Sequence, residues 1–160
     1  MGTDTKREML RHAVATLAYR AEKAVRGAPG SFAAYRTNET SRTPGQILAH
    51  IGDLLNWALC MAQGKYEWHD SAPLEWDAEV GRFYASLQKF DEYLASTTPL
   101  GFPAEKLFQG PIADALTHVG QIAMLRRVAG APVRGENYFK AEIVAGRVGP
   151  NQSARRVEFE

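Results

Sequence analysis

Apolar residues recur at helical spacing along four segments of the chain. The first segment carries apolar residues separated by alternating steps of four and three: Leu10, Val14, Leu17, Ala21 and Ala24. This spacing places one apolar stripe on a helix and predicts a helix over about residues 4–27. The helix begins near Asp4, where Thr5 and Glu8 have the spacing of a capping box.

The next two segments repeat this pattern with clearer boundaries. Thr43, Pro44 and Gln46 supply an N-cap, a proline at the first helical position and a capping-box glutamine, which predict a helix over about residues 44–63. A third helix is predicted over about residues 73–95 from apolar residues on one face: Trp76, Val80, Phe83, Leu87, Phe90 and Leu94. Such a sustained stripe is typical of helices packed in a bundle.

The fourth helix is predicted over about residues 111–129, with Pro111 at its first position. Its apolar residues spread around much of the cylinder, so we expect it to be deeply buried between neighbours. Gly120 lowers helix propensity and indicates close approach of another backbone. The helical period ends at Gly130, and residues 131–160 are predicted to form an extended tail with no sheet.

The chain length and charge narrow the class of protein. A chain of 160 residues predicts one domain over residues 1–160, and four helices of this length predict an all-α four-helix bundle. Because 19 basic residues nearly balance 18 acidic ones, we expect no nucleic-acid partner. The single cysteine, the absence of a signal-peptide pattern and the short apolar runs predict a cytoplasmic protein outside the membrane.

Polar residues on apolar helix faces are the candidates for chemistry. His50 projects about 60° from the centre of the second helix's stripe, at roughly 100° of rotation per residue. Asp114 and His118 are four residues apart, which places them on one face of the fourth helix. Two imidazoles and one carboxylate suit zinc, nickel, iron or manganese and leave positions open for water or substrate. Alternatively, these residues are hydrogen-bonded core groups.

Two further polar residues follow the candidate ligands by three positions. Asp53 and Gln121 are each either a group that orients an imidazole or a partly exposed residue at the rim of the site. His12 and His69 are assigned to the surface. The aromatic residues Trp57, Trp76 and Tyr84 are assigned to the core rather than to a substrate pocket.

The segments RTPGQILAHIGDLLNWAL and DALTHVGQIAMLRRVAG resemble the DinB/YfiT-like family of metalloenzymes, and the resemblance covers essentially the whole chain. In that family one histidine of the second helix and an HxxxH pair of the last helix hold a metal. By resemblance His50 and His118 match the first and last ligands, whereas Asp114 replaces the middle histidine. A carboxylate shifts the preference toward harder ions. The resemblance also implies an up-down-down-up topology and frequent dimers.

What the resemblance implies is a metal-dependent enzyme, either a transferase that uses a low-molecular-weight thiol or a hydrolase, acting on a small-molecule substrate. One alternative is a non-catalytic bundle that binds a metal or small ligand in a stress response, or only forms a homodimer. A second alternative is a degenerate site in which Asp114 has abolished metal binding.

Overall fold

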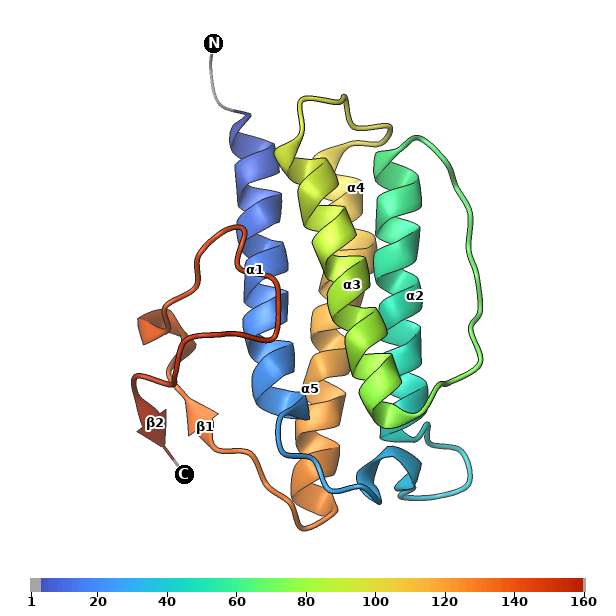
Figure 1. Ribbon diagram of the computed structural model, residues 1–160, viewed down its shortest axis with the longest axis vertical. Helices are drawn as coiled ribbons and strands as arrows, with labels where there is room; N and C mark the ends of the chain where they lie inside the picture. The colour runs from blue at the N-terminus through green and yellow to red at the C-terminus, as the bar shows by residue number, and fades with distance from the viewer. Residues whose placement is uncertain (1–3, 160) are drawn as a thin grey trace.

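The computed structural model describes residues 4–159 and is mostly helical, with a single two-stranded sheet in this range (Figure 1). The predicted domain bounds of 1 and 160 lie outside the described residues. The helical elements are α1 (Thr5–Val25), η1 (Phe32–Ala34), α2 (Pro44–Ala62), α3 (Trp76–Ala95), α4 (Ala104–Leu107), η2 (Phe108–Ile112), α5 (Ala113–Val128) and η3 (Tyr138–Lys140). The strands are β1 (Gly135–Glu136) and β2 (Glu158–Phe159), which pair antiparallel.

Local capping fixes where the first two long helices begin. Thr43 and Gln46 form the predicted capping box at α2, with Pro44 at its first turn. At α1 the cap is Asp4 and not the predicted Thr5, because the Asp4 carboxylate accepts from the amides of Lys6 and Arg7. The third helix begins at Trp76 and not at residue 73. The starts of α1 and α2 are therefore set by side chains that accept hydrogen bonds from the first free amides of each helix.

The last helical segment begins seven residues earlier than predicted. Helix α4 starts at Ala104 and continues through the π-helical turn η2 into α5, so Pro111 lies inside a continuous helical segment. A proline has no amide hydrogen and its ring crowds the preceding turn of an α-helix. The wider π-helical turn accommodates this ring, and the chain does not break.

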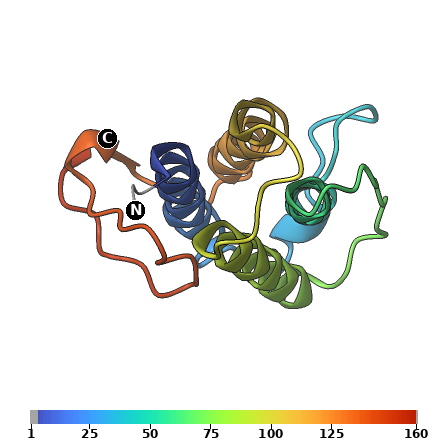
Figure 2. The ribbon, with the colours of Figure 1, turned by 90° about the horizontal axis from the view of Figure 1, so that it is seen from above.

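The four long helical segments lie side by side in a ring (Figure 2). Helix α1 packs against α3 and α5, and α2 packs against the same two helices. In Figure 1, α1 and α5 run from top to bottom, whereas α2 and α3 run from bottom to top. The connection over residues 63–75 therefore spans the length of the molecule, which makes α2 and α3 parallel neighbours.

One core fills the space between these helices. Its fully buried large side chains come from all of them: Leu17, Tyr19, Leu48, Ile51, Leu55, Phe83, Leu87, Phe90, Leu94, Leu107, Ile112 and Ile122. Helix α5 is less enclosed than its sequence predicts, because Met124 is 64% and Val128 51% exposed. The predicted close backbone approach at Gly120 is wrong, since among the described residues no atom of another segment lies within 4 Å of the position that a Cβ would take there.

The C-terminal segment folds back along α1 and is not a free extended tail (Figures 1 and 2). Val148 is 1% exposed, and the Tyr19 hydroxyl donates to the buried carboxylate of Glu136 at 2.7 Å. The paired strands are too short to leave an alternating pattern in the sequence.

Among residues 4–159, the helices are all too short or too polar to cross a membrane.

Candidate metal centre

The three predicted ligands come together in the seam between α2 and α5. His50 lies in the first half of α2, and Asp114 and His118 lie one turn apart in α5. The two helices pack against each other, which brings the imidazole of α2 to the pair on α5. One ligand atom from each of the three residues lies within 4.8 Å of the others.

The distances within this group are those of a potential coordination site. The Nε2 atom of His50 lies 3.7 Å from Asp114 Oδ2, and the Nε2 atom of His118 lies 3.4 Å from Asp114 Oδ1. Ligand atoms placed about 2.1 Å from a tetrahedral ion are separated by roughly 3.4 Å. The two ring centroids are 4.7 Å apart and nearly perpendicular. The three side chains could therefore hold a divalent ion.

The exposure of the three side chains differs. The side chains of His118 and His50 are 12% and 20% exposed, whereas that of Asp114 is 47% exposed. The two imidazoles therefore form the inner wall of the site, and the carboxylate lies on the solvent side. An ion held by these three groups would stay reachable from solvent, and three protein ligands leave further coordination positions open.

The environment of His50 favours its neutral form. Burial lowers the pKa of His50 below its ordinary value, and the nearby positive charge of Arg42 and the His118 ring lower it further, while Asp114 acts in the opposite direction. A metal binds the unprotonated imidazole. His50 is therefore in its metal-binding form at neutral pH.

Gln121 lies where it can orient the second imidazole. Its Oε1 atom is 2.8 Å from His118 Nδ1. With the amide oxygen as acceptor, Nδ1 donates and Nε2 keeps its lone pair toward Asp114. Such a hydrogen bond fixes both the tautomer and the direction of a ligating ring. This contact corresponds to the first of the two roles predicted for Gln121.

Asp53 has neither of its predicted roles. It is 4% exposed, and its carboxylate accepts from Arg82 at 3.0 Å and from the amide and hydroxyl of Ser71 at 2.9 and 2.7 Å. Gly52 leaves room for the guanidinium, because a Cβ there would lie 2.8 Å from Arg82 Nη2. Asp53 thus ties the 63–75 connection and α3 to α2 and belongs to the scaffold.

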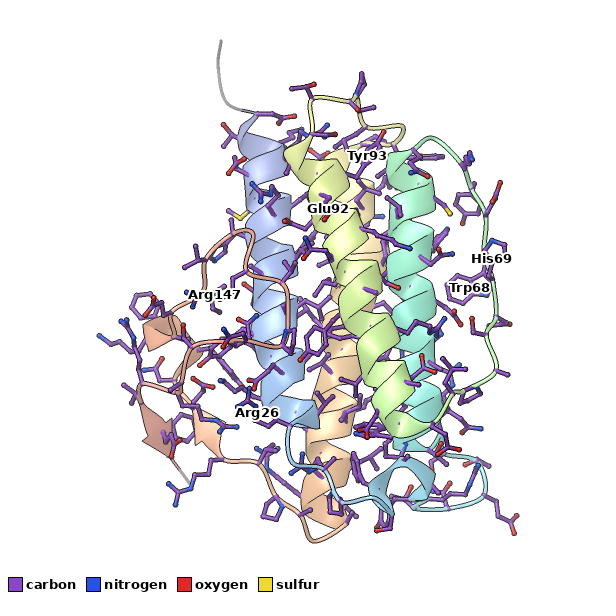
Figure 3. All side chains as sticks on the ribbon, in the orientation of Figure 1. Arg26, Trp68, His69, Glu92, Tyr93 and Arg147 are labelled. Atoms are coloured by element: carbon purple, nitrogen blue, oxygen red, sulfur yellow. The ribbon has the colours of Figure 1, made fainter. Side chains whose placement is uncertain are left out.

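Aromatic residues of the 63–75 connection form a wall beside His50 that the sequence prediction missed. The Trp68 ring lies 5.6 Å from the His50 ring and 5.8 Å from that of Trp57, in edge-on arrangements. Tyr66 also packs edge-on against Trp57. Figure 3 shows Trp68 beside α2 and His69 next to it on the connection. Two large aromatic residues in an otherwise polar loop were the signal for this wall.

The other residues considered from the sequence do not contact the three ligands. His12 is exposed, and the His69 side chain is 62% exposed, as predicted for surface histidines. Trp76 packs edge-on against Phe32, and Tyr84 is buried in the core against Phe83.

The chain has no match among protein-family models, curated proteins or solved structures.

Proposed function

We propose that this protein is a divalent-metal-dependent enzyme of the DinB superfamily, a thiol-dependent S-transferase or a hydrolase that acts on a small molecule. The observation that carries the proposal is the convergence of His50, Asp114 and His118 from two facing helices. The DinB-like segments of the sequence contain all three residues.

The helix arrangement supports the same proposal. The packing order α1, α3, α2, α5 and the helix directions match what we expect of an up-down-down-up four-helix bundle (Figures 1 and 2). In a simple up-and-down bundle each helix packs against the helices next to it in the chain. Here α2 and α3 are parallel, and the connection between them runs the full length of the molecule.

His50, Asp114 and His118 would hold the ion, and Gln121 would orient the His118 ring. A bound divalent ion lowers the pKa of a thiol or water and so supplies a nucleophile at neutral pH. The two histidines bind in their neutral forms, and the exposed Asp114 leaves the site open to small reactants. Trp68 packs edge-on beside the His50 ring and adds an aromatic face to this side of the site.

The first experiment measures metal content in protein purified without a nickel column. We expect a divalent ion at near one per chain, and a higher melting temperature when zinc, nickel, iron or manganese is added to metal-free protein. An ion at about one hundred times its Kd stabilises the fold by about 2.7 kcal/mol, which is roughly 5–10 °C in a domain of this size. Trp68 fluorescence changes with loading, because its ring contacts the His50 ring.

The matched variants are His118→Ala and His12→Ala. The first removes a proposed ligand, and the second removes an exposed histidine of α1. We expect His118→Ala to lose metal-dependent stabilisation and His12→Ala to keep it. If no ion binds wild-type protein or raises its melting temperature, the site is degenerate and the proposal is wrong.

Catalysis is tested separately with the metal-loaded protein. Thiol transfer to a panel of electrophiles and hydrolysis of ester and amide substrates should depend on the metal and on His118. If the ion binds but no substrate turns over, the protein is a non-catalytic metal-binding bundle.

A further inference from the structure

A cavity of about 490 Å³ lies next to His118, between α5 and the segment that leads into α2. Two residues of the candidate metal centre, His118 and Gln121, are among those that line this cavity. Cavities that hold small organic ligands have volumes of about 300–1,000 Å³. A ligand in this space would therefore lie beside the proposed ion.

Most of the wall is apolar. The apolar side chains that line the cavity are Ile47, Met124, Leu125 and Val128. Two of them, Met124 and Val128, are exposed side chains of α5, whereas Leu125 also packs against the helical core. Helix α5 therefore carries apolar side chains that its packing against the other helices does not bury. These side chains offer contact to a hydrocarbon group and not to an inorganic ion.

One guanidinium supplies the charge. Arg42 lines the cavity, and within residues 4–159 it forms no ion pair and donates no side-chain hydrogen bond. No acidic side chain among the described residues lines this cavity. The neighbouring Arg36, in contrast, donates to the carbonyls of Glu39 and Ser41. Arg42 is therefore free to bind a carboxylate, which a guanidinium holds with two parallel hydrogen bonds.

We propose that this cavity binds a small organic carboxylate whose apolar body lies along α5 and whose carboxylate pairs with Arg42. This inference rests on the proposed function in one respect: the bound carboxylate would react only if the neighbouring site holds a metal. It does not need the metal for binding, since the Arg42 charge and the apolar wall belong to the chain. Binding to metal-free protein therefore tests it independently.

The experiment titrates metal-free protein with 3-phenylpropionate, 3-phenylpropanol and 3-phenylpropylamine and follows amide NMR shifts. We expect the carboxylate to bind at least about tenfold more tightly than the alcohol, and the amine most weakly. Acetate, which lacks the apolar body, should bind more weakly than 3-phenylpropionate. Equal affinity for carboxylate and alcohol overturns the proposal.

Two charge variants and one wall variant locate the binding. Arg42→Gln should remove the preference for the carboxylate, whereas Arg127→Gln, an exposed arginine of α5 outside this cavity, should keep it. Met124→Ser should weaken 3-phenylpropionate and 3-phenylpropanol alike. Arg42 and Met124 are exposed, so the melting temperature of each variant should match that of wild type. A preference that survives Arg42→Gln overturns the proposal.

A second arm identifies which reactant carries the carboxylate. Zinc-loaded protein is titrated with 3-mercaptopropionate and 3-mercaptopropanol. An Arg42-dependent preference for the mercaptocarboxylate assigns the anion to the thiol reactant, and equal binding of the two thiols assigns it to the electrophile. If zinc fails to bind but Arg42 still selects 3-phenylpropionate, the proposed function is wrong and the carboxylate site stands.

Discussion

Two buried arginines, Arg7 of α1 and Arg126 of α5, and the polar groups of the α2–α5 seam are bonded in different ways. Arg7 of α1 is 8% exposed and donates to four backbone carbonyls at the end of α3 and beyond: Tyr93, Leu94, Ser96 and Thr98. Arg126 is 5% exposed and donates to carbonyls at the end of α1 and to Ala131. These contacts supply donors to carbonyls at helix ends, where intrahelical partners run out, and to carbonyls of the loops that follow.

The α2–α5 seam differs because its polar groups converge without saturating one another. Within residues 4–159 the side chains of His50 and Asp114 form no hydrogen bond, although each lies within 4 Å of another candidate ligand. Among these three residues only His118 has a hydrogen-bond partner, Gln121. A saturated buried group stabilises the fold, whereas converging groups with spare lone pairs have capacity for a ligand.

The largest expected effect is a loss of stability when the hydrogen bonds of the buried Arg7 are removed. Arg7→Met leaves several helix-end carbonyls without a donor and should lower the free energy of unfolding by about 2–4 kcal/mol, or roughly 5–15 °C in melting temperature. Urea denaturation measures it. The control is Arg127→Met, an exposed arginine with one long contact to its own helix, which should change stability by less than about 0.5 kcal/mol. Equal stability of the two variants would show that the carbonyl contacts contribute little.

The next effect concerns the seam alone. Gln121→Ala removes the group that orients His118 and should weaken metal affinity by about 10- to 100-fold. Because Gln121 is exposed, the metal-free protein should keep its stability. Gln88→Ala removes an exposed helical glutamine of α3 that contacts Glu92 and should leave affinity unchanged. Competition titration against a chelating dye measures both variants, and identical affinities would contradict the orienting role.

A smaller effect is expected on the metal preference of the α2–α5 seam. Asp114→His exchanges the carboxylate for a third imidazole at the same i, i+4 position. Nitrogen ligands favour nickel and zinc over manganese, so the ratio of zinc to manganese affinity should rise by roughly tenfold. The ratio is measured by competition between the two ions, with Asp70→His, at an exposed loop position, as the control. An unchanged ratio would show that Asp114 does not bind the ion.

The smallest effect is a pH dependence of the metal-free protein. Because the folded state lowers the pKa of His50 below 6.5, the unfolded chain takes up a proton at a higher pH than the folded chain does. The contribution of His50 to stability is present above pH 6.5 and falls as the pH drops toward the lower folded value. His50→Gln should flatten this dependence between about pH 7.5 and 5.5, whereas His69→Gln should retain it. Urea denaturation at several pH values measures the slopes, and a parallel slope in His50→Gln would contradict the assignment.

The sequence predicted the helices best where local chemistry decides them. Thr43, Pro44 and Gln46 mark the start of α2 because the cap is made by residues three positions apart. The prediction failed at Pro111, which has the signature of a helix start but lies inside a helical segment. The helix continues through that proline by way of the π-helical turn, whose flanking residues Leu107 and Ile112 are fully buried in the core. This tertiary packing leaves no local pattern in the sequence.

The candidate site shows the same division. His50, Asp114 and His118 could be selected from helical projection and spacing, since each lies on a helix with a regular period. The role of Asp53 could not, because its partners Ser71 and Arg82 are 18 and 29 residues away. Trp68 and Arg42 reach the site from loops, where the sequence carries no period that fixes a direction.

The π-helical turn at Phe108–Ile112 also sets the angular phase of everything that follows it. Each residue of an α-helix advances the chain by 100°, and a π-helical turn accommodates one residue more than an α-helical turn does. Deleting Pro111 would remove the extra residue together with the proline ring and rotate α5 by about a quarter of a revolution relative to α4. Asp114 and His118 would then turn away from α2 together. A one-residue deletion at this turn could therefore abolish the site in a descendant of this chain and leave its helices intact.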